Sequence, residues 1–73
     1  MKKRDALRLK PGDAIAWGDS VRTAATQIMR TGTVVCVTPA GGILTTDVYR
    51  CQRDGPPLLE PDDTWVPYTH VVR

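Results

Sequence analysis

Hydrophobic and polar residues alternate over short stretches that are bounded by proline and glycine. The clearest run, residues 33–38, is rich in β-branched side chains and lies between Gly32 and the turn residues 39–42. Residues 43–51 follow that turn, so the two runs predict a β-hairpin. An earlier strand is expected at residues 14–17, because Pro11 and Gly12 favour a turn just before it.

In the C-terminal third, turn-forming residues again separate the predicted strands. Residues 54–57 and 61–63 are rich in proline, glycine and aspartate, which predicts a loop. A fourth strand is expected at 64–66, and Pro67 ends it. Residues 68–70 have the length of one tight turn, after which Val71 and Val72 begin a fifth strand. The fold class is therefore mainly β.

Residues 20–31 allow two interpretations. Their apolar residues have the spacing of an amphipathic helix, with Ser20 as N-cap and Gly32 just past the end. Three threonines within this short segment favour instead a long extended loop or a bent hairpin arm. The apolar set is Val21, Ala24, Ala25, Ile28 and Met29.

Three segments resemble parts of Src-homology-3-like barrels. The run Leu9-Lys10-Pro11-Gly12-Asp13-Ala14-Ile15 resembles the opening strand of Tudor and related barrels, and Gly32-Thr33-Val34-Val35-Cys36-Val37 resembles their second strand and that of KOW modules. The run Val66-Pro67-Tyr68-Thr69-His70-Val71 resembles the one-turn helix before the last strand of peptide-binding Src-homology-3 domains. The resemblance implies a small five-stranded Src-homology-3-like barrel over residues 9–73, and an architecture does not specify a ligand.

Chain length and composition favour binding over catalysis. A domain of 73 residues buries only about 60% of its unfolded surface, which leaves little material for a deep cleft. No apolar run approaches the roughly 18 residues of a membrane span, and the charged start lacks the apolar stretch of a signal peptide. The sequence therefore predicts a cytoplasmic protein without a membrane partner.

The net charge of +2 is unevenly distributed. Residues 1–10 carry five basic and one acidic side chain, a balance of +4, so residues 11–73 carry −2. Residues 1–8 are expected to be a flexible basic arm, either a phosphate-seeking tail or a solvated end. With the arm, the arginines could form one positive face opposite acidic residues, or they could be scattered. The positive set is Lys2, Lys3, Arg4, Arg22, Arg30, Arg50 and Arg53, and the acidic set is Glu60, Asp62 and Asp63.

Aromatic residues are few and contain no phenylalanine. In a barrel of this kind they can converge on one rim, where they would stack on bases or surround a cation. The alternative is that the tryptophans fill the core. The aromatic set is Trp17, Tyr49, Trp65 and Tyr68.

The cysteine, histidine and aspartate residues are not spaced as in known catalytic or metal-binding motifs. A symmetric hairpin places Cys36 opposite Thr45 and leaves Cys51 about 20 Å farther along the strand, too far for a disulfide. Cys36 is expected to be a core thiol and Cys51 a free thiol near a strand end. The single histidine, His70, is expected to be a turn residue, and the adjacent Asp62 and Asp63 to be solvated. No enzyme activity, cofactor, metal or small-molecule substrate is expected.

These observations predict a small non-enzymatic binding module. The leading hypothesis is binding to nucleic acid through the basic arm, the arginine face and the aromatic rim. The alternative is a protein-interaction module or a small homo-oligomeric subunit, which would dimerise through the apolar stripe at 21–29. That stripe would present Val21, Ala25, Ile28 and Met29.

Overall fold

The computed structural model describes residues 1–20 and 28–72. A short helix comes first, five strands follow, and a one-turn 3-10 helix lies near the C-terminal end of the chain. In chain order these elements are α1 (Lys3–Ala6), β1 (Ala14–Trp17), β2 (Arg30–Val37), β3 (Gly42–Arg50), β4 (Leu58–Leu59), β5 (Thr64–Pro67) and η1 (Tyr68–His70). The mainly-β class predicted from the sequence is confirmed.

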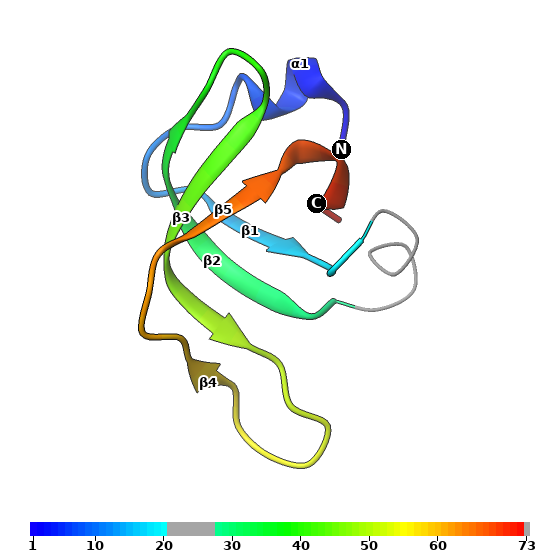
Figure 1. The fold of residues 1–73 in the computed structure, drawn as a ribbon, viewed down its shortest axis with the longest axis vertical. Coiled ribbons are helices and arrows are strands. Elements are labelled where there is room, and N and C mark those ends of the chain that lie inside the picture. The colour runs from blue at the N-terminus through cyan, green and yellow to red at the C-terminus, as the bar shows by residue number, and fades with distance from the viewer. Residues whose placement is uncertain (21–27, 73) are drawn as a thin grey trace.

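All five strands belong to one antiparallel sheet, which is not closed into a barrel (Figure 1). The order is β1-β2-β3-β4, and β5 also pairs with β3. The β1 edge meets the C-terminal segment through a single isolated bridge between Trp17 and Val71, with a hydrogen bond from the Val72 N–H to the Ala16 carbonyl (2.8 Å). The prediction of a five-stranded barrel is therefore only partly confirmed, since the strands form an open, curled sheet.

The fifth strand is not the one predicted. We expected it at Val71 and Val72, but after η1, which occupies the predicted turn at 68–70, the described chain forms only the isolated bridge of Val71 with Trp17. It is β4 that completes the five, inside a segment predicted to be a loop. Tyr49 and Arg50 of β3 pair with Leu59 and Leu58.

The predicted turns are confirmed in detail. Gly12 and Gly41 have φ angles of 95° and 92°, which suit glycine. The Thr38 N–H donates to the Gly42 carbonyl (2.8 Å) and closes the β2–β3 hairpin. β2 begins at Arg30, before the expected start, and runs through Gly32. A side chain there would be crowded, because a Cβ would lie 3.0 Å from Cη2 of Trp17.

The hairpin register differs from the symmetric one. Val34, rather than Cys36, lies opposite Thr45, and an irregularity between Val34 and Cys36 shifts the pairing. Because neighbouring strand residues face opposite sides, this shift leaves Cys36 exposed. The prediction of a core thiol is wrong. Thr45 is instead the buried polar residue, and its hydroxyl donates to the Thr64 carbonyl (2.7 Å).

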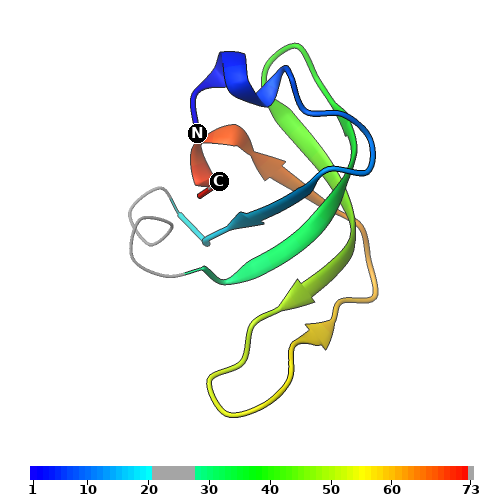
Figure 2. The ribbon, with the colours of Figure 1, turned by 180° about the vertical axis from the view of Figure 1, so that it is seen from behind.

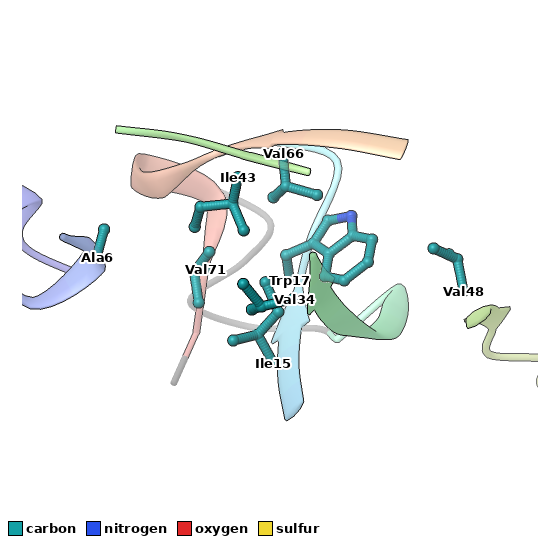
Figure 3. Close-up of a cluster of buried hydrophobic side chains, with 8 residues drawn as sticks. All are labelled: Ala6, Ile15, Trp17, Val34, Ile43, Val48, Val66 and Val71. Carbon is teal, nitrogen blue, oxygen red and sulfur yellow. The ribbon is translucent and has the colours of Figure 1, made fainter. Parts of the chain in front are cut away.

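The core is formed by side chains of α1, β1, β2, β3, β5 and the C-terminal segment, and β4 contributes none (Figure 3). In that view Val48 lies at one end of the cluster and Ala6 at the other, with Trp17 between them. The cluster comprises Ala6, Ile15, Trp17, Val34, Ile43, Val48, Val66 and Val71. Within the described residues, no helix is long and apolar enough to cross a membrane.

The N-terminal segment is folded against the sheet, in contrast to the flexible arm that we predicted. Ala6 of α1 is fully buried in the core, and Met1 and Leu9 pack against it. The Met1 amino group donates to the Val71 carbonyl at 3.1 Å. Burial of these three apolar side chains opposes fraying of the segment, although it carries five cations.

Most of the ambiguous segment, residues 21–27, lies outside the described residues, so the choice between helix and loop is untested. Its end is described. The Met29 N–H donates to the Trp17 carbonyl (2.9 Å), and its own carbonyl accepts from the Cys51 N–H (2.9 Å). These two bonds hold residue 29 between the end of β1 and the end of β3.

Candidate functional site

An open groove lies where the β2–β3 turn meets β5 and η1. We call it the Trp65 groove, after its most exposed large side chain. Trp65 is 56% exposed, so its indole is available to a ligand. None of the lining side chains is charged, and all but the Tyr68 hydroxyl and the indole N–H are apolar. The lining residues are Ala40, Gly41, Gly42, Trp65, Val66, Pro67 and Tyr68.

Small residues keep the groove open. A Cβ at Gly41 would overlap the ring of Tyr68, whereas a Cβ at Gly42 would lie 3.1 Å from Oγ1 of Thr38 and at an ordinary contact distance of 3.8 Å from Cε3 of Trp65. Both rings therefore lie over backbone that carries no side chain. The Tyr68 N–H donates to the Gly41 carbonyl (3.1 Å), which joins η1 to the hairpin turn. Residues 39–42 were predicted only as a turn; the run of small residues at 40–42 is the sequence signal for this groove.

The predicted aromatic rim is only partly assembled. Trp17 is 3% exposed and belongs to the core, so its assignment to the rim is wrong. Its indole packs over Gly32, which provides the space for a large ring. Tyr49 is exposed but lies away from Trp65. It pairs with Leu59 of β4, whereas Trp65 pairs with Leu44, five residues earlier on β3. The structure brings together only Trp65 and Tyr68.

Five cations lie in the N-terminal segment, which packs beside η1 through α1. We call them the N-terminal cationic cluster: Lys2, Lys3, Arg4, Arg8 and Lys10. All five are exposed, and no ion pair found in the described part of the chain involves them. Asp5 is the one acid within residues 1–10, and the carboxylate of Asp13, just after them, accepts the Lys10 backbone N–H (2.8 Å).

The strand arginines, unlike the N-terminal cations, form ion pairs. Arg30 and Arg50 lie opposite each other on β2 and β3, and Glu60 lies within ion-pair distance of both. The Glu60 carboxylate is 3.8 Å from Nε of Arg30 and 3.7 Å from Nε of Arg50. Arg30 also pairs with Asp19 at 2.6 Å. We predicted Glu60 on an opposite acidic face; that is wrong, since the pairing of β4 with β3 and the hydrogen bond from the Glu60 N–H to the Val48 carbonyl (2.7 Å) hold Glu60 beside the arginines.

The N-terminal cationic cluster and the ion-paired group of Arg30, Arg50 and Glu60 lie at different ends of the molecule. Along the longest axis of 36 Å, α1 and the β2–β3 turn occupy one end, while β4 and the 51–57 loop occupy the other (Figures 1 and 2). Among the described residues, the cations of the N-terminal segment therefore do not share one face with the 51–57 loop. Arg53 is exposed in the distant loop, and Arg22 lies outside the described residues.

The end near β4 carries a second exposed apolar surface. Leu59 is 60% exposed, and Tyr49 and Leu58 are also solvent-accessible. Of the predicted interface stripe, Ile28 is exposed and Met29 half-buried, while Val21 and Ala25 lie outside the described residues. Pro57 comes directly before β4 and Pro61 follows soon after, which limits extension of that edge by another strand.

Cysteine and histidine contribute no cluster. Cys36 and Cys51 are both free and exposed, as expected for Cys51 alone. His70 lies in η1, as predicted for a turn residue, and its carbonyl accepts the Gly18 N–H (3.2 Å). No group of three potential metal ligands occurs in the described residues.

Comparison with known proteins gives no family assignment. No protein-family model, curated protein or solved structure significantly matches the chain.

Proposed function

We propose that this protein is a small non-enzymatic nucleic-acid-binding module. Its phosphate-contacting surface is the N-terminal cationic cluster. The observation that carries the proposal is the separation of charge: the cluster has five exposed cations without ion pairs in the described residues, whereas Arg30 and Arg50 share Glu60. Unpaired cations can neutralise phosphates and release the counterions condensed on the nucleic acid, and this release drives non-specific nucleic-acid binding.

A folded cluster is better suited to this role than a loose arm. Because Ala6 is buried and Met1 is hydrogen-bonded to Val71, the backbone that carries the cations is already ordered before binding. Less conformational entropy is then lost when phosphates are contacted. The non-enzymatic part of the proposal is supported by the Trp65 groove, which is open to solvent and presents no carboxylate, histidine or thiol to a substrate.

The architecture is proposed to be of the Src-homology-3-like type. The order of elements supports this assignment: a first strand, a long connection, a hairpin, two further strands, one 3-10 turn and a return to the first strand. A cytoplasmic location is also proposed, supported by two exposed free thiols of a kind that a reducing compartment maintains.

Neutralising α1 is expected to weaken nucleic-acid binding and flatten its salt dependence. The variant is Lys2→Ala/Lys3→Ala/Arg4→Ala, and alanine is compatible with the helix. Each lost phosphate contact reduces the slope of log K against log salt by about 0.7 to 0.9, so the slope should fall by about 2 to 3 if all three cations make contacts. Fluorescence anisotropy of a labelled oligonucleotide at several salt concentrations measures it.

A matched control is Arg50→Ala/Arg53→Ala, which removes cations from the opposite end. We expect its salt slope to equal that of the unmodified protein. An equal decrease of the salt slope in both variants would indicate diffuse electrostatic attraction rather than a defined phosphate-binding surface. Failure of the unmodified protein to bind any oligonucleotide at low salt would refute the proposed function.

A second candidate function, protein association, is favoured by the exposed apolar residues near β4. Replacing Leu58 and Leu59 with glutamate would place charges on this surface, so a self-associating protein should shift toward monomer. Light scattering across a concentration series measures the mass. A monomeric mass for the unmodified protein at all concentrations would exclude self-association through these residues.

A further inference from the structure

The Trp65 groove has the form of a site for one flat, uncharged ring. Trp65 projects from β5 on the exposed face and pairs with Leu44 across the strand. Ala40, Gly41 and Gly42 form one wall with almost no side-chain volume, and Pro67 and Tyr68 continue the surface. A ring placed in the groove would contact the indole without displacing a packed side chain.

The lining discriminates between classes of ligand. A cationic group bound beside the indole would lack a counter-charge, because no carboxylate lines the groove. An apolar peptide would fit the groove but would gain nothing from the neighbouring cations. A nucleotide suits both the groove and the neighbouring cations. Its base is flat and uncharged, and its phosphate is an anion.

The position of the groove connects it to the N-terminal cationic cluster. The groove is lined by the β2–β3 turn and η1, and α1 packs beside η1. Figures 1 and 2 place the turn, η1 and α1 at the same end of the molecule. A strand with one base in the groove therefore has phosphates within the same end of the protein as five cations.

We propose that the ligand is single-stranded nucleic acid, with one unpaired base stacked on Trp65 in the groove and the flanking phosphates on the cationic cluster. This inference rests on the proposed function and specifies its substrate class. Single strands are required because a duplex hides the faces of its bases inside the stack, whereas an unpaired base presents a whole face to an aromatic side chain.

Replacing Trp65 tests the inference directly. For Trp65→Ala we expect the affinity for a labelled oligothymidylate to fall by about 5- to 150-fold, the equivalent of one lost base stack. Trp65→Phe should retain most of the affinity. The salt slope should be unchanged, because no phosphate contact is removed. Duplex DNA, which cannot insert a base, should bind the Trp65→Ala variant and the unmodified protein equally.

Two further variants separate stacking from general effects. Tyr49→Ala removes an exposed aromatic residue outside the groove and should leave oligothymidylate affinity unchanged. Ala40→Glu adds a carboxylate to the groove while Trp65 stays in place, and should weaken oligothymidylate binding more than the uncharged Ala40→Gln does. Circular dichroism melting verifies that each variant remains folded.

The outcomes distinguish this inference from the proposed function. Loss of oligothymidylate affinity in Trp65→Ala, with duplex binding retained, supports base stacking. Unchanged affinity in Trp65→Ala, together with a flattened salt slope in the α1 variant, overturns base stacking and leaves nucleic-acid binding intact. An unmodified protein that binds neither oligothymidylate nor duplex overturns both.

Discussion

Replacement of Trp17 by alanine is expected to destabilise the fold by about 3–5 kcal/mol, the usual cost of truncating a large buried aromatic side chain. Trp17 is 3% exposed and lies within the core cluster. Its ring packs over Gly32, where no side chain can fill the vacated space. At about 0.05–0.15 kcal/mol per residue, a 73-residue domain has a total stability of roughly 4–11 kcal/mol. The variant is therefore expected to be marginally stable or unfolded.

Urea unfolding followed by circular dichroism measures this loss. Trp65→Ala is the matched control, because it makes the same chemical change at a side chain that is 56% exposed. Its effect should be clearly smaller than that of Trp17→Ala, because more than half of this residue stays in water in the folded protein. Equal shifts of the two unfolding midpoints would contradict the assignment of Trp17 to the core and Trp65 to the surface.

Most of the strand and turn positions could be predicted because they depend on local properties. β-Branched runs between proline and glycine indicated β2, β3 and their hairpin, and the φ angles of Gly12 and Gly41 follow from turn chemistry. β4 was missed because its two leucines lie between prolines, and its pairing with β3 is a tertiary effect. The bulge that exposes Cys36 likewise has no local signature.

The candidate site was predictable in composition but not in arrangement. The cations near the N-terminus and the scarcity of aromatic residues are visible in the sequence. Whether a tryptophan is core or surface depends on what faces it, and Trp17 is buried because a glycine lies beneath its ring. The pairing of Glu60 with Arg30 joins residues far apart in the chain, so charge counting alone assigned Glu60 to the wrong face.

The same dependence on tertiary contact makes Gly41 the most sensitive turn position. Gly41→Ala is expected to destabilise the fold by about 2–5 kcal/mol. Part of this is the cost of a non-glycine residue at a φ of 92°, about 1–2 kcal/mol. The rest arises because the new Cβ would overlap the ring of Tyr68, which packs against the core and is hydrogen-bonded through its backbone to Gly41.

Gly12→Ala isolates the backbone contribution. Gly12 has a φ of 95°, but no atom lies within 4 Å of its Cβ position, so this variant should show only the conformational cost. Urea unfolding of both variants gives the difference between the two sites. Tyr68→Ala removes the obstructing ring, and in that background Gly41→Ala should cost no more than Gly12→Ala does. If the cost remained larger there, the strain would have to come from the hairpin backbone, and Tyr68 would not be the residue that requires glycine at 41.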